Sequence, residues 1–177
     1  HIALRRDVAI KILLERTRSS AQMGVRFERE AYSASRLSHP NCLQVTDFGM
    51  AEGGILYMVM ELLDGKELAA IIEEKGRLEV SEALEYLEQI SHALDRSHAV
   101  QVVHRDLKPD NVLVSENDGI LKITDLGVAH DEAKKGHTVT RYGAVLGTAE
   151  YMSPEQVRGT AVDVRTDIYA CGILLYE

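Results

Sequence analysis

The sequence predicts an α+β fold in two parts, a small strand-rich part followed by a mostly helical part. Two observations predict it: β-branched apolar runs of strand length dominate the chain up to residue 61, and apolar residues at helical spacing dominate the rest of the chain. No repeat, low-complexity tract or Gly/Pro-rich linker interrupts the 177 residues, a length that suits one domain. A ligand site is therefore expected between the two parts.

The first part is predicted to hold three strands and one helix. Its apolar runs have strand length, and the last two flank a Gly-rich turn at residues 52–54. Between the first two runs, Phe27, Ala31 and Ala34 recur at helical spacing, and Pro40 follows. The strands are expected at residues 8–14, 43–49 and 55–61, and the helix at about 21–37.

The second part is predicted to be mainly helical, with one short strand pair. Apolar residues at helical spacing predict the helices, and an Asn-Asp-Gly turn at 117–119 separates two short apolar runs. About 30 polar, Gly-bearing residues after residue 124 are too many for an idle loop in a compact domain. The helices are expected at residues 67–74, 81–97 and 165–177, and the strands at 112–114 and 121–124.

Composition limits the molecules and the cellular surroundings that the protein can be expected to meet. A formal net charge of −8 argues against nucleic-acid binding, which requires a basic face. Cys42 and Cys171 lie far apart without metal-ligand spacing, which favours a reducing compartment and a cytoplasmic location. No apolar run approaches the length of a membrane span, so no membrane contact is expected within this segment.

The stretch HRDLKPDN at 104–111 holds the densest set of reactive side chains. Asp106 and Asn111 supply oxygen atoms around Lys108, and Asp125 follows a predicted strand. An amide oxygen and a carboxylate suit Mg²⁺, a second carboxylate suits proton abstraction from an alcohol, and a lysine suits charge neutralisation. These are the requirements of phosphoryl transfer, which depends on positioning and electrostatics.

With four further motifs, this stretch resembles the eukaryotic-type (Hanks-type) protein kinases. The segments HPN at 39–41, GTAEYMSPEQ at 147–156 and DIYACGILLYE at 167–177 resemble most of all the bacterial serine/threonine kinases. The motifs occur in the family's order: VAIK at 8–11, Glu30, HRDLKPDN at 104–111, DLG at 125–127 and SPE at 153–155. The resemblance implies a bilobal protein-kinase-like fold that is truncated at both ends. We expect a partial N-lobe and hinge at 1–63, without the Gly-rich loop, and a partial C-lobe at 64–177 that ends within helix F.

The resemblance implies a protein kinase that transfers the γ-phosphate of ATP to serine or threonine hydroxyls, with ATP and Mg²⁺ as cofactors. It makes Asp106 the catalytic base and places Lys108 on the γ-phosphate. Lys11 would hold the α and β phosphates, with Glu30 as its ion-pair partner. The resemblance implies Asn111 and Asp125 as the metal ligands.

The resemblance also implies an adenine slot. Ala9 and Leu113 would sandwich the base, and Met60 would be the gatekeeper residue. The Glu61 carbonyl and the Leu63 amide would make the hinge hydrogen bonds.

Regulation and substrate class follow from the same resemblance. Lys108 and Thr148 indicate serine or threonine substrates, and Arg105 indicates control by phosphorylation of the segment 125–155. Thr140 is the first candidate phosphosite and Thr138 the second, and a dimer would allow phosphorylation in trans. Structural roles are expected for five residues: His104, Arg105, Thr148, Glu155 and Asp167.

Two alternatives to an active kinase remain open. The isolated segment would be a catalytically silent, pseudokinase-like ATP-binding module if the missing phosphate-covering loop and lobe are indispensable. A small-molecule phosphotransferase of kinase-like fold is disfavoured by the motifs at 147–148 and 153–155, which serve peptide binding in the family. A membrane anchor outside the segment is also compatible with the resemblance.

Overall fold

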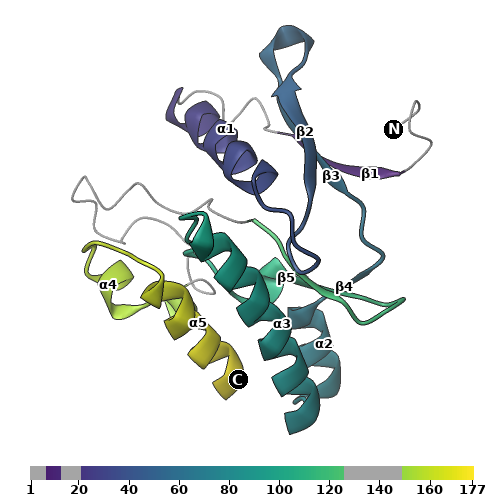
Figure 1. Cartoon of the computed structure of the whole chain (residues 1–177), viewed down its shortest axis with the longest axis vertical. Helices are drawn as coiled ribbons and strands as arrows, with labels where there is room; N and C mark the ends of the chain where they lie inside the picture. Colours follow the sequence, from purple (N-terminus) through teal and green to yellow (C-terminus); the bar gives the residue numbers. More distant parts are fainter. Residues whose placement is uncertain (1–6, 13–20, 126–148) are drawn as a thin grey trace.

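A computed structural model describes residues 7–12, 21–125 and 149–177 of the chain. Within these ranges, the strand-rich part and the helical part are distinct, which confirms the predicted arrangement. Figure 1 shows one sheet with α1 against it at the upper end, the helices α2, α3, α4 and α5 at the lower end, and a second small sheet between them. The two parts therefore meet at the second sheet.

The upper part is a three-stranded antiparallel sheet in the order β1-β3-β2, with one helix against it. Phe27 and Ala31 of the helix pack with Met58 of the central strand, and these three side chains are its buried centre. The predicted helix and strands are confirmed, although residues 13–14 of the first strand lie outside the described residues. The elements are β1 (Val8–Ile12), α1 (Ala21–Ser35), β2 (Val45–Met50) and β3 (Leu56–Glu61).

The lower part is built around α3, which has buried Ile90, Ala93 and Leu94 along one face. These side chains pack in a continuous core with α2, α5 and the second sheet. The three predicted helices are confirmed as α2 (Leu68–Lys75), α3 (Val80–Ala99) and α5 (Arg165–Tyr176). None of the helices in the described ranges is both long and apolar enough to cross a membrane.

The second sheet contains one strand that the sequence did not predict. Both predicted strands are confirmed, and the additional strand, β4, pairs with β5. All three β4 residues are exposed, so no apolar alternation marks it. Gly65 is required there, because a Cβ would lie 2.3 Å from the Val114 carbonyl oxygen. The strands are β4 (Gly65–Glu67), β5 (Val112–Ser115) and β6 (Leu121–Ile123).

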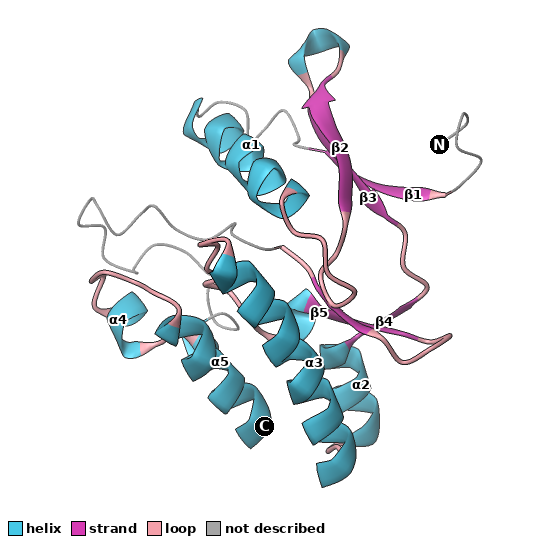
Figure 2. Cartoon of the chain, in the orientation of Figure 1, coloured by secondary structure: helices cyan, strands magenta, loops and turns pink. Residues whose placement is uncertain are grey.

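The loop between α1 and β2, drawn in pink in Figure 2, connects the upper part to the second sheet. Leu43 N donates to the Ile123 carbonyl at 3.0 Å, and Ile123 N donates to the Asn41 carbonyl at 2.9 Å. The buried Asn41 amide donates to the Leu121 carbonyl at 2.9 Å and to Gln89 of α3 at 2.8 Å. The loop thus fixes the upper part to β6, the strand that leads to Asp125.

Candidate active site

Lys11 and Asp125 form an ion pair between the two parts. Lys11 Nζ lies 2.7 Å from Asp125 Oδ1, although the residues are 114 positions apart. Ala9 is paired with Met60 and Lys11 with Met58, so these four side chains share one face of the upper sheet. The Lys11 and Asp125 side chains remain 38% and 45% exposed, so a charged ligand can reach both.

Asp106 and Asn111 form a second contact beside this ion pair. The Asn111 amide nitrogen donates to the Asp106 carbonyl at 2.7 Å and to its carboxylate at 3.1 Å. Thr124 N donates to the Asn111 carbonyl at 2.9 Å, which places this pair next to Asp125. Asp125 itself has a φ of 54°, a left-handed conformation that aspartate tolerates better than most residues. The structure therefore gathers the two predicted metal ligands, the predicted base and Lys11.

The oxygen donors here fit a magnesium ion. Hydrogen bonding of the Asn111 amide nitrogen to Asp106 fixes the orientation of its amide group, and Asp125 supplies a carboxylate. Among the described residues, no group of three or more His, Cys, Asp or Glu side chains could hold a metal alone. Mg²⁺ does not require such a cage, since it is commonly held by one or two protein oxygens plus waters and substrate phosphates.

Asp167 accepts hydrogen bonds from the backbone of the loop that carries Asp106. Its carboxylate is fully buried and accepts hydrogen bonds from His104 N at 2.9 Å and Arg105 N at 2.8 Å. The ring of His98 on α3 lies 2.7 Å from the same carboxylate. His98 is a site residue that the sequence analysis missed, because a single histidine near a helix end carries no distinguishing pattern.

Arg105 is held in a left-handed conformation with φ 69°, which costs an arginine roughly 1–2 kcal/mol. Bonds on both sides of the residue offset this cost: its N–H donates to Asp167, and its carbonyl accepts from Gln156 Nε2 at 2.7 Å. Gln156 belongs to α4 (Pro154–Val157), a short helix that the sequence did not predict and that begins with a capping box at Ser153. This backbone turn sets the direction of the neighbouring Asp106.

Glu155 and Thr166 form a further contact beside Asp167, between α4 and α5. Thr166 Oγ1 donates to Glu155 Oε1 at 2.8 Å and lies 3.1 Å from the buried Ser153 hydroxyl. The Thr166 hydroxyl is the main cause of a lowered pKa at Glu155. Glu155 therefore connects the end of the segment 125–155 to α5, and its structural role in the family stays a prediction.

Burial favours the uncharged form of His104 at pH values where a solvated imidazole takes up a proton. Burial lowers the pKa of this fully buried imidazole from 6.5, and the nearby Asp167 carboxylate only partly opposes that effect. Its Nδ1 accepts from Asp106 N at 3.3 Å and its Nε2 lies 2.9 Å from the Thr124 carbonyl, which fits the neutral Nε2–H tautomer.

Below pH 6.5, the unfolded chain takes up a proton at His104 that the folded chain does not. This residue therefore lowers the free energy of unfolding as the pH falls, by at most about 1.4 kcal/mol per pH unit. We expect NMR of the imidazole nitrogens at pH 5.5 to show neutral His104 in the folded protein and a charged ring in urea. A charged ring in the folded protein would contradict the burial argument.

The residues of the expected adenine slot come from both parts. Ala9 and Met60 are cross-strand partners, whereas half-buried Leu113 lies on β5 in the second sheet. Leu63 lies in the connection between β3 and β4. A pocket that includes Met60 in its wall is lined by Ala34, Leu43, Val45, Met58, Met60, Ile123 and Asp125. Their contacts with a nucleotide stay predictions.

Several predicted residues are not described, or only in part. Thr138, Thr140 and Thr148 lie outside the described residues. Glu30 lies on α1, but its side chain is not among those described, so the expected Lys11–Glu30 pair stays a prediction. Lys108 is half-buried next to the turn Pro109–Asn111, two residues after Asp106.

The whole chain, residues 1–177, matches the family model described as protein kinase domain. A probable serine/threonine-protein kinase of Clostridium acetobutylicum is 42% identical over 98% of this chain, which covers 26% of that protein. Serine/threonine-protein kinase pkn3 of Myxococcus xanthus is 40% identical over 99% of this chain, which covers 33% of that protein. PknB of Mycolicibacterium smegmatis is 41% identical over 99% of this chain, which covers 28% of that protein.

Solved structures agree with the fold. The crystal structure of the Mycobacterium tuberculosis PknI kinase domain superposes with a TM-score of 0.77 at 28% identity, over 99% of this chain and 64% of that one. A single-substitution mutant of that kinase domain gives a TM-score of 0.73 over 95% of this chain and 61% of its own. The chain therefore spans a quarter to a third of the curated relatives and about two thirds of the solved kinase domains.

Proposed function

Because the chain belongs to the protein kinase domain family, we propose that it carries the catalytic centre of a serine/threonine protein kinase. The observation that supports this proposal most is the convergence of two contacts at one place, Lys11 with Asp125 and Asn111 with Asp106. Phosphoryl transfer needs a cation for the nucleotide phosphates, oxygen ligands for Mg²⁺ and a carboxylate for the acceptor hydroxyl, all within reach of one another.

In this proposal, Lys11 binds the α and β phosphates of ATP, and Glu30 restrains its flexible side chain. Asn111 and Asp125 hold Mg²⁺, which neutralises charge on the phosphate oxygens. Ala9, Leu113 and Met60 line the adenine slot, while the Glu61 carbonyl and the Leu63 amide bond to the base. Lys11 must exchange its contact with Asp125 for contacts with the nucleotide, which the partial exposure of both side chains allows.

Asp106 accepts the proton of the substrate hydroxyl as that oxygen attacks the γ-phosphorus. The new bond joins the substrate oxygen to phosphorus. The bond from phosphorus to the bridging oxygen breaks, and its electron pair leaves with ADP. Lys108 balances the negative charge on the transferring group. Hydrogen bonds from Asn111 to the carbonyl and the carboxylate of Asp106 orient the base for this step.

Substrates and regulation belong to the same proposal. The names of the relatives support serine and threonine hydroxyls of proteins as acceptors. In this proposal, residues 1–63 form a partial N-lobe with the hinge, and residues 64–177 form a partial C-lobe. Thr140, then Thr138, stay the candidate phosphosites, Thr148 the residue of the substrate-binding loop, and a dimer the proposed arrangement for phosphorylation in trans.

The experiment is transfer of labelled phosphate from γ-labelled ATP to a generic protein substrate. Label on serine or threonine, present with Mg²⁺ and absent after chelation by EDTA, is the expected result. Metal removal is expected to act because chelation takes away the Mg²⁺ that neutralises the phosphate charge, which the lysine side chains of the site do not balance alone. Label found only on tyrosine would contradict the substrate class, and ATP binding without any transfer would favour the silent module.

A further inference from the structure

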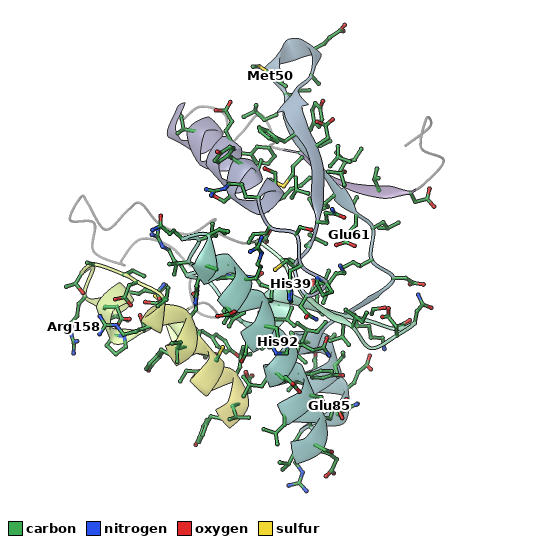
Figure 3. All side chains as sticks on the ribbon, viewed as in Figure 1. His39, Met50, Glu61, Glu85, His92 and Arg158 are labelled. Atoms are coloured by element: carbon green, nitrogen blue, oxygen red, sulfur yellow. The ribbon has the colours of Figure 1, made fainter. Side chains whose placement is uncertain are left out.

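The carboxylate of Glu61 connects three segments at the boundary between the two parts. Glu61 is the last residue of β3, and Figure 3 shows it where the chain leaves the upper sheet. Its Oε1 accepts from Gln44 N at 2.7 Å and from Lys122 Nζ of β6 at 2.8 Å. The Glu61 and Lys122 side chains are only 28% and 16% exposed, so solvent screens this pair less than a surface pair. We call Glu61, Gln44 and Lys122 the hinge joint.

Backbone bonds run between the same segments. Glu61 N donates to the Gln44 carbonyl at 3.0 Å, and Leu43 N donates to the Ile123 carbonyl at 3.0 Å. The residues 41–44 therefore lie between the end of β3 and β6. Lys122 adds the side-chain link from β6 to the end of β3.

The hinge joint lies between the two sides of the candidate active site. On one side, β3 pairs with β1, which carries Lys11, and Glu61 is the cross-strand partner of Val8. On the other side, Lys122 precedes Asp125 by three residues on the strand that leads to it. A shift of β3 relative to β6 would change the distance between Lys11 and Asp125.

We propose that Glu61 and Lys122 are positioning residues that hold the two parts in the arrangement able to bind a magnesium nucleotide. The proposal rests on the proposed function, and it gives the Glu61 side chain a role separate from the hinge carbonyl. Without the ion pair, a smaller fraction of molecules has Lys11 and Asp125 correctly spaced. The apparent affinity for the nucleotide then falls in proportion to that fraction, while saturating nucleotide restores the competent arrangement.

The test compares Lys122→Met, Glu61→Gln and the double variant with the unaltered protein. Glu61→Gln retains an oxygen for the Gln44 N–H but loses the charge. We expect each single variant to raise KM for MgATP by about 3–10-fold and change kcat by less than about twofold, since binding repopulates the competent state. The double variant is expected to match the single ones, because both remove one interaction. Lys122→Arg keeps the positive charge, so its KM for MgATP is expected to stay close to that of the unaltered protein.

The matched control is Lys66→Met, which removes another lysine–glutamate pair, between Lys66 of β4 and Glu74 of α2. Lys66 lies 3.0 Å from Glu74, and both side chains are well exposed. We expect this variant to leave KM unchanged. A KM for MgATP that changes by less than twofold in Lys122→Met would overturn the proposal. An increase of KM in Lys66→Met as large as that in Lys122→Met would also overturn it.

A distance measurement separates this inference from the proposed function. Spin labels at the exposed positions Glu52→Cys and Glu85→Cys, with Cys171→Ser, report the spacing of the two parts without nucleotide. Lys122→Met should broaden the distance distribution, and an unchanged distribution would overturn the proposal. Loss of phosphate transfer in the unaltered protein would instead refute the proposed function, whatever the distances show.

Discussion

Replacing Asp106 with Asn is expected to lower kcat for phosphate transfer by about 10²–10⁴-fold, the usual contribution of a general base. The amide has almost the shape of the carboxylate, but it cannot take up the proton of the attacking hydroxyl. An amide oxygen at position 106 can still accept the bond that Asn111 Nδ2 now makes to the carboxylate at 3.1 Å. Steady-state kinetics with MgATP and a protein substrate measure the effect, and KM for MgATP should change little.

The matched control for this prediction is Asp110→Asn. Asp110 lies in the same loop, in the turn Pro109–Asn111, but its side chain is exposed and has no role in the proposed mechanism. We expect kcat of this variant to stay within about twofold of the unaltered protein, as for most surface substitutions. Equal values of kcat for Asp106→Asn and Asp110→Asn would remove Asp106 from its proposed role.

Replacing Asp167 with Asn is expected to destabilise the fold by about 1–3 kcal/mol, the cost of leaving a buried hydrogen-bond donor without an acceptor. Asn offers one oxygen, whereas both carboxylate oxygens of Asp167 are used: Oδ1 accepts from Arg105 N, and Oδ2 accepts from His104 N and meets the ring of His98. The amide NH₂ would then face a backbone N–H, so two donors would meet without an acceptor. Urea unfolding measures the loss.

The same substitution is also expected to lower kcat, because Arg105 would lose a bond that holds its left-handed backbone beside Asp106. Asp163→Asn is the control, since Asp163 pairs with Arg165 at the start of the same helix but is 53% exposed. Surface pairs contribute about 0–1 kcal/mol, so the control should unfold at nearly the same urea concentration as the unaltered protein. A similar loss in both variants would show that burial of Asp167 has no special effect.

The local sequence pattern was sufficient to predict most of the helices and strands. The helix α3 was predictable because Ile90 and Leu94 lie four residues apart on its buried face, and α1 because Phe27 and Ala31 do the same. Strand β4 was not predictable, because its exposed residues pair through their backbone alone. The helix α4 has a capping signal at Ser153 but only four residues, too few for apolar periodicity to mark it.

The candidate site also has a part that the sequence predicts and a part that it does not. Lys11, Asp106, Asn111 and Asp125 were identifiable because their residue types occur in motifs with a recognisable order along the chain. The sequence could not indicate that His98 meets Asp167 across 69 positions, or that Glu61 meets Lys122 across 61. Neither pair has a local spacing, and each consists of common residue types that are usually solvated.

The sequence by itself determined most of the helices and strands and the side chains that are chemically suited to phosphoryl transfer. Hydrophobic periodicity and motif chemistry are properties of neighbouring residues, so they can be recognised without knowing the path of the chain. Only the tertiary structure decided that Lys11 reaches Asp125 and that a buried carboxylate holds the loop of Asp106. Such contacts arise where the packing of the two sheets and α5 brings polar groups together and excludes water, which makes each missing partner costly.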